Sequence, residues 1–503
     1  MQNTNLIMIC RHAIIRRYAP SCMTTVWVLL VLINLLVMFV NLGYVFTNKQ
    51  EQQQQQHNQN LQGHPRLLGH HRQQQPYYAP NESPNKLMVQ ENFALLRGAL
   101  RDSPQNMETL KNDSRTMPAH ETHTFALRGD DWEDLISSWP VCLSTQASAD
   151  LLFWVGEHIK TWSGPMSVAV YVPDSDFYVA MKMIEVLLSC SEDVRRRVSF
   201  HVTYPAEFPP KAMPLDNPKL LAHGCDQLEM YNEYLLSEMN GTLQSRQPAG
   251  QFLYPQNLLR NIARDNCKTD YVFTPDVDMV LVAGGIDVHL KSFLDRPDAR
   301  RCRKCAFIIP AYEISTEAPH NPVDKSELLL FLKKNKLARR FHVKIFKPNQ
   351  ANSQLKLWER PTAGKELKGK KDRKQQQQQQ QEALQDSLMR EANGTLRVLY
   401  DVTTWQNFWE PVYVARAPVP PFDERFVGYG CTRSSQIYEM HVAGFSWRVL
   451  NDAFLCHRGF QDRRARELWG QINRNFNLYQ DFKREVDKKY GEQVKKQKAP
   501  EEI

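Results

Sequence analysis

The sequence lacks the patterns by which proteins read nucleic acids. Its 503 residues contain no helix-turn-helix, zinc-finger or RNA-recognition pattern. The net charge of +8 comes from 63 Lys and Arg against 55 Asp and Glu, and it is spread along the chain and partly held in low-complexity tracts. Because no concentrated basic stripe results, nucleic-acid binding is not indicated. The hydrophobic fraction of 42% still permits a large core, in one large domain or two ordinary ones.

A second pair of cysteines at zinc-site spacing is also missing. Cys302 and Cys305 form one Cys-x-x-Cys pair, for which zinc or redox chemistry is only an alternative. Beyond the apolar run described next, the chain has an even number of cysteines, which predicts some disulfide bonds in an oxidising compartment without revealing their pairing. These cysteines are Cys142, Cys190, Cys225, Cys267, Cys302, Cys305, Cys431 and Cys456.

One long apolar run lies near the N-terminus. Residues 24–46 carry no charge and are numerous enough to cross a bilayer as a helix. Three arginines lie in residues 1–23, whereas Lys49 is the only basic residue close behind the run. The positive-inside rule therefore predicts a cytosolic tail, a single-pass type II membrane anchor and a lumenal remainder. A cleaved signal peptide is the alternative, but no small-x-small cleavage site closes the run.

Two segments have compositions that do not build a core. Residues 47–122 are rich in Gln, His, Asn and Pro and predict a disordered stem. Residues 365–393 combine a basic cluster with a Gln run and predict a disordered insertion, although a basic loop could instead hold an anionic glycan. The catalytic domain is predicted over 123–495. Sequons that fit lumenal exposure occur at Asn81, Asn112, Asn240 and Asn393.

The globular part alternates strands with helices. The predicted strands are 141–144, 167–172, 198–202 and 305–310. The predicted helices are 149–161, 181–188, 257–266 and an amphipathic tail helix over 467–490. The β-α-β-α-β order at the start favours an α/β fold with a largely parallel, Rossmann-like sheet.

The stretch 271–280 is the most informative part of the chain. Its apolar run ends in Asp276 and Asp278, as a buried strand does when it brings acids to the edge where α/β sheets bind ligands. Two carboxylates so spaced suit a divalent cation that holds a nucleotide diphosphate, because oxygen ligands leave coordination positions for phosphate. Asp174 and Asp176 form a competing pair, so this motif alone has low specificity.

A third metal ligand is expected, and His457 is the best candidate. It ends an apolar run that begins at Ala453, and imidazole together with carboxylates suits manganese. The alternative is an ordinary half-buried histidine.

Several polar residues could bind the nucleotide. Arg260 and Arg264 share one helix face just before the acidic stretch, and guanidinium groups match phosphate geometry, although both could instead pair with local acids. Ser144, Thr145 and Gln146 follow the first strand at the usual place for nucleotide recognition, or they are ordinary loop residues.

Seven motifs follow one another in order between about Val141 and Tyr490. They are Tyr254-Pro255-Gln256-Asn257-Leu258-Leu259-Arg260-Asn261-Ile262-Ala263-Arg264, Asp276-Val277-Asp278, Phe422-Asp423-Glu424-Arg425-Phe426, Tyr429-Gly430, Glu439-Met440-His441-Val442-Ala443-Gly444-Phe445, Val449-Leu450-Asn451 and His457-Arg458-Gly459-Phe460. In this order they resemble a family of glucuronyltransferases. The family includes the β-1,4-glucuronyltransferase that primes the dystroglycan glycan (glycosyltransferase family 49), and the glucuronyltransferase domain of the LARGE enzymes is similar.

The resemblance implies a GT-A fold with a Rossmann-like central mixed sheet, a UDP-sugar donor, Mn²⁺ and inversion at the anomeric carbon. It implies that Asp276, Asp278 and His457 serve the metal, and that the enzyme is a Golgi membrane protein with a lumenal catalytic domain. The implied reaction moves glucuronate from UDP-glucuronate to a xylose-ended, O-mannosyl-type glycoprotein glycan. One catalytic domain is visible, so one kind of sugar is added. The oligomeric state stays open, a homodimer included.

The sequence does not name a catalytic base. Many GT-A enzymes carry a carboxylate after a Tyr-Gly step, but here Gly430 is followed by Cys431. Asp423 and Glu424 are the nearest acidic candidates, and either could merely organise the turn. Transfer of another UDP-sugar, such as N-acetylglucosamine or xylose, and a silent glycan-binding relative remain alternatives. The arginines that could face a glucuronate carboxylate are Arg416, Arg425, Arg433 and Arg458.

Overall fold

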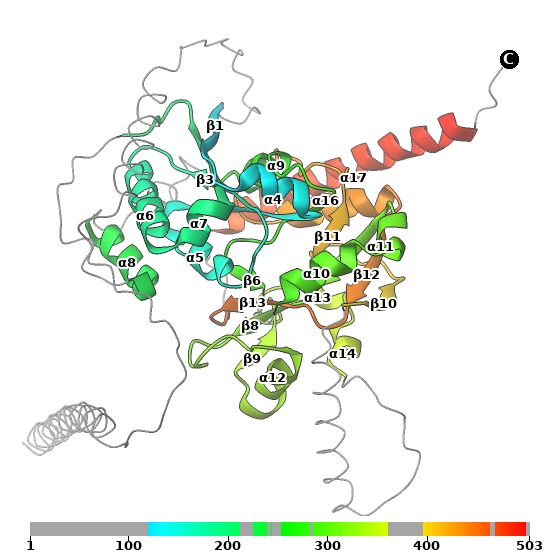
Figure 1. Cartoon of the computed structure of the whole chain (residues 1–503). Helices are drawn as coiled ribbons and strands as arrows, with labels where there is room; N and C mark the ends of the chain where they lie inside the picture. The colour runs from blue at the N-terminus through cyan, green and yellow to red at the C-terminus, as the bar shows by residue number, and fades with distance from the viewer. Residues whose placement is uncertain are drawn as a thin grey trace, which may run out of the picture. The chain divides into compact units, whose positions relative to one another are not determined.

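The computed structural model describes residues 119–211, 225–238, 243, 253–281, 285–360, 396–462 and 468–498 (Figure 1). They belong to one compact unit, Asn81–Ile503. The predicted cytosolic tail, membrane segment and insertion and all four sequons lie outside these residues. Among the described residues, no helix combines the length and the apolar character needed to cross a membrane. The folded part begins slightly earlier than predicted, because strand β1 (His120–Leu127) includes the last residues assigned to the stem.

A nine-stranded mixed sheet has the order β1-β4-β3-β2-β5-β11-β7-β12-β10. The block β4-β3-β2-β5 is parallel, as the alternating sequence predicts. Outside this block β7 and β12 are also parallel, whereas β1, β11 and β10 pair antiparallel with their neighbours. The sheet as a whole is therefore mixed, as the resemblance implies, and not largely parallel. The other strands of the sheet are β2 (Val141–Ser148), β3 (Met166–Tyr171), β4 (Val198–Pro205), β5 (Tyr271–Phe273), β7 (Cys305–Ile309), β10 (Val398–Val402), β11 (Val412–Arg416) and β12 (Ser446–Leu450).

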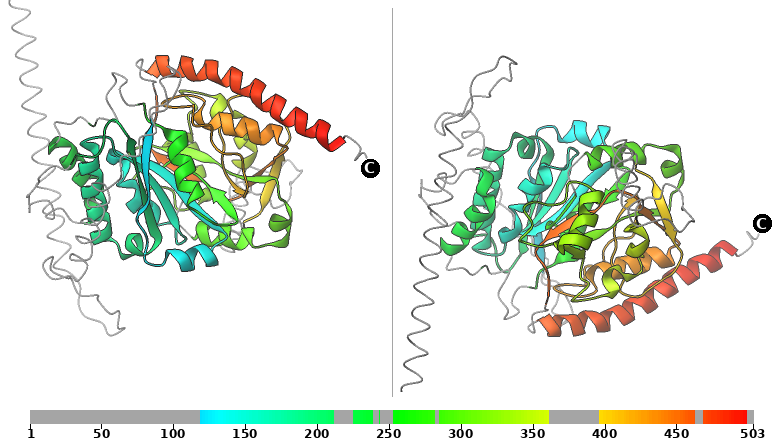
Figure 2. Two further views of the ribbon diagram at one scale, coloured as in Figure 1. Left: turned by 90° about the horizontal axis from the view of Figure 1, so that it is seen from above. Right: turned by 90° about the horizontal axis from the view of Figure 1, so that it is seen from below.

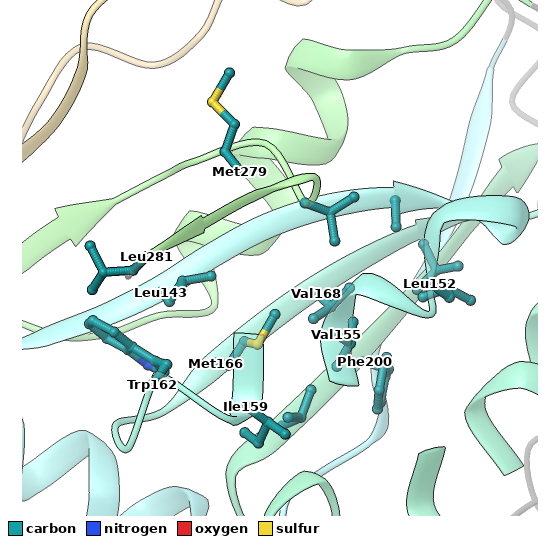
Figure 3. Packing of buried hydrophobic residues seen from close by; sticks show 14 of the residues in the cluster. Leu143, Leu152, Val155, Ile159, Trp162, Met166, Val168, Phe200, Met279 and Leu281 are labelled. Atoms are coloured by element: carbon teal, nitrogen blue, oxygen red, sulfur yellow. The ribbon is translucent and has the colours of Figure 1, made fainter. Parts of the chain in front are cut away.

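A smaller sheet decides where the acidic residues lie. Its order is β6-β13-β8-β9, and its strands are β6 (Met279–Leu281), β8 (Ala311–Ile314), β9 (Ala338–Arg340) and β13 (Leu455–Arg458). The stretch 271–280 is therefore not one strand, because β5 belongs to the large sheet and β6 to the small one. Residues 274–278, the acid loop, connect the two sheets. Met279 and Leu281 pack into the same core as Leu143 and Val168 (Figure 3), which anchors the end of this loop.

Helices cover the parallel block and position its loops. The predicted helix 149–161 is divided into a short 3-10 turn, η1 (Ala149–Leu151), and α5 (Trp154–Ile159), whereas α6 (Asp176–Cys190) extends well beyond the predicted 181–188. Helix α9 (Gln256–Asp265) packs on β3 through Leu259 and Ala263. The remaining helices of this region and of the second half are α4 (Trp132–Ser138), α7 (Glu192–Arg197), α8 (Leu228–Glu238), α10 (Ile286–Leu294), α11 (Pro297–Arg301), α12 (Lys325–Leu330), α13 (Pro348–Ala351) and α14 (Leu355–Trp358).

Two helices near the C-terminus lie side by side. Helix α16 (Thr432–Val442) has no counterpart among the predicted helices, while α17 (Trp469–Lys498) confirms the predicted amphipathic tail helix. Figures 1 and 2 show α17 as a long helix along the outer side of the ribbon, next to α16. Its apolar stripe buries Tyr479, Phe482 and Val486 against Phe426, so the helix is packed on the domain.

Three disulfide bonds account for six of the eight cysteines that lie in the described residues. They join Cys142 to Cys267, Cys190 to Cys225 and Cys302 to Cys305. The last bond excludes zinc ligation by the Cys-x-x-Cys pair, because a disulfide sulfur is not a thiolate. Within the described part of the chain, the two remaining thiols are Cys431 and Cys456.

Candidate active site

A cavity of about 780 Å³ collects residues from both sheets and from the C-terminal helices. The acid loop forms one wall, and α9, α16 and the N-terminal part of α17 contribute others. Among the described residues that line it, three carry a carboxylate, namely Asp276, Asp278 and Glu410. Cavities of this size, with a few convergent polar groups, are typical ligand sites.

In the acid loop, burial of Val277 determines where Asp276 and Asp278 point. Val277 is only 2% exposed and belongs to the core, so its carboxylate neighbours are left on the cavity side. His158 holds the loop from behind, because its Nε2 lies 2.9 Å from the Val277 carbonyl oxygen. Burial lowers the pKa of His158 to about 4, so the ring is neutral and its Nε2–H donates to that carbonyl.

Asp276 lies between two buried guanidinium groups. Its Oδ1 accepts hydrogen bonds from Arg260 Nη2 at 2.7 Å and Arg433 Nη2 at 2.9 Å. Burial alone would raise the pKa of Asp276, but the two arginines hold it far below its usual range. Gln146 Nε2 is 3.4 Å from the same oxygen, and its Oε1 accepts the Tyr254 hydroxyl. Two of the residues predicted to bind nucleotide, Gln146 and Arg260, therefore meet at Asp276.

Strand pairing brings His457 to Asp278. In the antiparallel pair β6–β13, His457 is opposite Met279, the residue after Asp278. The distance from His457 Nε2 to Asp278 Oδ2 is 3.5 Å. Burial would lower the pKa of His457, but the Asp278 carboxylate raises it above its ordinary value. His457 does not itself line the cavity, whereas Asp278 and Gln461, whose amide nitrogen is 2.9 Å from His457 Nε2, do.

The Asp278–His457 pair has the donor chemistry of a manganese site. It offers one carboxylate and one imidazole, which suit that ion. The other ring nitrogen, Nδ1, is 3.2 Å from the Gly459 carbonyl oxygen, and such a second hydrogen bond orients many metal-binding histidines. No group of three His, Cys, Asp or Glu side chains within the described ranges is gathered closely enough to hold a metal.

Three predicted nucleotide-binding residues lie behind the cavity wall. Ser144 Oγ donates to the carbonyl of the last β5 residue at 3.1 Å, and Thr145 Oγ1 donates to the Pro275 carbonyl at 2.9 Å. Arg264 donates to the Pro420 carbonyl at 2.8 Å. Ser144 and Thr145 are fully buried, and none of the three lines the cavity. Their contacts fix the backbone on either side of the site.

The two acidic residues predicted as base candidates also lie outside the cavity lining. Asp423 pairs with Arg425 at 2.6 Å, and Glu424 accepts a hydrogen bond from Asn261 Nδ2 at 2.8 Å. Both acids therefore stabilise the turn before α16. This is the alternative to a role as catalytic base that the sequence allowed.

Glu410 lines the cavity and was not singled out from the sequence. Its Oε2 accepts a hydrogen bond from Asn349 Nδ2 at 2.7 Å, and its Oε1 accepts one from the Ser434 backbone N–H at 3.3 Å. The available signal was an acid directly before the proline that leads into the buried strand β11. Four arginines are candidates to face a glucuronate carboxylate, and of these four only Arg433 lines the cavity.

A tight loop before α16 is held by α17. Asn475 Nδ2 donates to the carbonyls of Val427, Tyr429 and Gly430 at 2.9, 3.1 and 2.9 Å. Gly428 has a φ of +67°, a left-handed conformation that residues with a side chain rarely adopt, so this turn favours glycine. This loop brings Tyr429, Gly430 and the start of α16 to the cavity.

Aromatic rings form a less polar side of the cavity. Phe346, Phe408 and Phe476 line it, and the Phe408 ring centroid is 6.2 Å from that of Phe346 and 5.7 Å from that of Phe476. Phe408 has a φ of +64°, an unusual backbone conformation for a bulky residue.

Comparison with known proteins gives consistent matches. The family model described as glycosyl-transferase for dystroglycan matches residues 140–382 and 372–491. Beta-1,4-glucuronyltransferase 1 of Bos taurus is 32% identical over 361 residues, covering 70% of this chain and 76% of that protein. The Homo sapiens protein of that name matches with the same identity and coverage. The xylosyl- and glucuronyltransferase LARGE2s of Gallus gallus is 26% identical over 376 residues, covering 74% of this chain and 39% of that protein.

Proposed function

Because the chain belongs to the family of glycosyltransferases described as glycosyl-transferase for dystroglycan, we propose that it transfers glucuronate from UDP-glucuronate to a glycan acceptor. The enzyme class follows from the family, and the donor sugar is proposed from the relatives named beta-1,4-glucuronyltransferase 1. The observation that carries the proposal is the 3.5 Å contact of His457 with Asp278, which lines a cavity that also holds the Arg260–Asp276–Arg433 cluster.

The cluster of two arginines and Asp276 would receive the nucleotide diphosphate. Each guanidinium group uses an N–H on Asp276, which fixes its direction, and both groups line the cavity. The two guanidinium groups share one carboxylate oxygen, and guanidinium groups match the geometry of phosphate oxygens such as those of a UDP-sugar. Tyr254 and Gln146, which also line the cavity, brace this cluster.

Manganese fits the donor atoms that the site offers. Asp278 and His457 would hold the ion, and Asp276 remains the proposed third protein ligand, with its Oδ1 already shared by two arginines. When bound, the ion would act as a Lewis acid that stabilises charge on the departing UDP. The Gly459 carbonyl, near Nδ1, would keep the His457 ring oriented, and the Gln461 amide would lie next to Nε2, the nitrogen that faces Asp278.

The proposed reaction is an in-line displacement with inversion in a GT-A fold. An acceptor hydroxyl of a xylose-ended, O-mannosyl-type glycoprotein glycan attacks the anomeric carbon, and a base accepts its proton. Residence in the Golgi membrane, with a lumenal catalytic domain, is part of the same proposal.

A donor panel tests the proposal on the purified full-length chain in detergent with manganese. UDP release and product formation are measured with UDP-glucuronate, UDP-xylose and UDP-N-acetylglucosamine, each with a xylose-ended acceptor. Turnover with UDP-glucuronate alone is expected. Turnover with a different sugar would replace the proposed donor, and no metal-dependent turnover with any of them would indicate a silent glycan-binding relative.

A further inference from the structure

We infer that Glu410 is the general base that takes the proton from the attacking acceptor hydroxyl. The inference rests on the proposed transfer reaction and supplies the residue that the sequence left unnamed. It follows from which carboxylates reach the cavity and from what each of them already contacts.

Among the described cavity carboxylates, one neither accepts a hydrogen bond from an arginine nor belongs to the proposed metal pair. Asp276 is held by two guanidinium groups at 2.7 and 2.9 Å, so it is poorly suited to accept a proton. Asp278 faces His457 at 3.5 Å and belongs to the proposed metal pair. Glu410 is the third carboxylate on the described cavity wall, and its two hydrogen bonds come from neutral groups.

The position of Glu410 is fixed by neighbours on both sides. Its backbone N–H donates to the Asn349 carbonyl at 2.9 Å, while the Asn349 side chain donates to its Oε2 at 2.7 Å. The Ser434 N–H at the start of α16 donates to Oε1 at 3.3 Å. Each carboxylate oxygen has two lone pairs, so each can still accept one more hydrogen bond from the cavity. A carboxylate that is held in place and half-buried is well prepared to accept a proton.

The electrostatic environment of Glu410 favours a role as general base, but the assignment rests on the contacts described above. Burial raises the pKa of Glu410 above its ordinary value, and the positive charges of Arg433 and Arg260 offset only part of that effect. Other groups near this carboxylate are the Cys431 thiol, whose pKa burial raises to about 12, and the Ser434 hydroxyl. None of these neighbours carries a negative charge near neutral pH.

In the proposed transfer, each bond that forms is matched by one that breaks. The acceptor oxygen forms a bond to the anomeric carbon, and the bond from that carbon to the UDP phosphate oxygen breaks, its electron pair leaving with UDP. The acceptor proton moves to an Oε of Glu410 and is later lost to solvent. No oxidant or further reactant is needed.

Glu410→Gln is the direct test, because an amide keeps the shape and one acceptor oxygen but cannot take the proton. On full-length enzyme with manganese, UDP-glucuronate and acceptor, we expect kcat to fall by about 10²- to 10⁴-fold. The affinity for UDP with manganese and the melting temperature are expected to stay within twofold and about 2 °C of the wild type. Glu207→Gln, at an exposed glutamate that does not line the cavity, is the matched control and should retain full activity.

The pH profile and a second variant distinguish a loss of proton transfer from a loss of the folded structure. The acidic limb of the wild-type kcat/KM profile should disappear in Glu410→Gln, and Glu410→Asp should recover part of kcat with a displaced limb. A Glu410→Gln enzyme within threefold of wild type with an unchanged profile would overturn the assignment, as would loss of activity in Glu424→Gln instead. A folded Glu410→Asp variant as inactive as Glu410→Gln would also overturn it. A wild type without turnover on any UDP-sugar would remove the proposed function, and this inference with it.

Discussion

At the scale of single residues, the site depends on partners that lie far apart in the chain. Asp278 and His457 meet because β6 and β13 pair in a register that sets His457 opposite Met279. The competing motif, which begins at Asp174, lies outside this site. Asp174 forms an ion pair with Lys211 at 2.7 Å and does not line the cavity. The two Asp-x-Asp motifs can therefore be distinguished by experiment.

We predict that Asp278→Asn lowers metal-dependent transfer at least 100-fold, because a neutral amide is a much weaker ligand for a divalent cation. Asp174→Asn is the matched control and should leave the rate within twofold. Both rates are measured with manganese as the only added metal, and circular dichroism checks the fold. Equal activity of the two variants would contradict the assignment of the metal to the acid loop.

His201 should make folding stability sensitive to acid. Its Nδ1 accepts the Phe125 N–H at 2.8 Å, and its Nε2 lies 2.9 Å from Ser167 Oγ, whose hydroxyl donates to the Ala263 carbonyl. A proton on Nδ1 would face another N–H. Burial, assisted by the Arg128 charge, lowers the pKa of His201 to about 4.

The sign of this effect follows from comparing folded and unfolded states. Between an unfolded pKa of about 6.5 and the folded value, the unfolded chain binds a proton that the folded protein does not, so stability falls as the pH falls. At pH 7.5 the contribution is fully present, and by pH 4.5 about 2–3 kcal/mol should be lost. Denaturant unfolding at both pH values should show a smaller loss for His201→Gln than for the wild type. Parallel losses in the two proteins would disprove this role.

At the scale of elements, α17 supports the cavity through one asparagine. Asn475 is buried and donates to three loop carbonyls, whereas Asn473, two residues earlier in the same helix, is exposed. The loop is therefore positioned by a helix that contributes its own cavity-lining residues at its start.

Asn475→Ala should destabilise the protein by about 1–3 kcal/mol, because buried carbonyls lose their donor. We also expect a higher KM for the UDP-sugar, since the loop carries part of the cavity wall. Asn473→Ala provides the control and should change neither quantity measurably. Unfolding curves and initial rates over a range of donor concentrations measure both effects, and identical behaviour of the two variants would count against the loop contact.

The disulfides should differ in their contribution to stability. Cys142 and Cys267 are separated by 125 residues, so their bond restricts a long loop of the unfolded chain, while Cys302 and Cys305 are separated by 3. The chain-entropy relation gives about 5 kcal/mol for the long loop and about 2 kcal/mol for the short one. Replacing each pair by serine and comparing unfolding free energies tests the order, and a larger loss for the short loop would contradict it.

At the scale of the whole molecule, ligand binding should stabilise the folded chain. The cavity draws on the large sheet, the small sheet and α17, so a ligand bound there contacts elements that separate on unfolding. At 100 times its dissociation constant, UDP with manganese should add about 2.7 kcal/mol. A thermal-shift measurement should show a higher melting temperature with both ligands, abolished by a chelator and absent in His457→Ala. A shift of equal size after chelation would exclude a metal contribution.

The sequence by itself determined the local features of this protein. Strand and helix periods identified the parallel block and the amphipathic α17, since these depend on neighbours within a few residues. The ordered motifs also identified the family. The sequence could not predict that 271–280 divides between two sheets, that α16 forms, or that Ser144, Thr145 and Arg264 lie behind the wall.

Only the tertiary structure decided which polar residues share the cavity. The β6–β13 register set His457 beside Asp278, and the approach of α9 and α16 placed Arg260 and Arg433 on one oxygen of Asp276. Glu410 reached the cavity because Asn349 and the start of α16 hold it there. Such contacts arise from packing between segments distant in the chain, and no local pattern of residues encodes them.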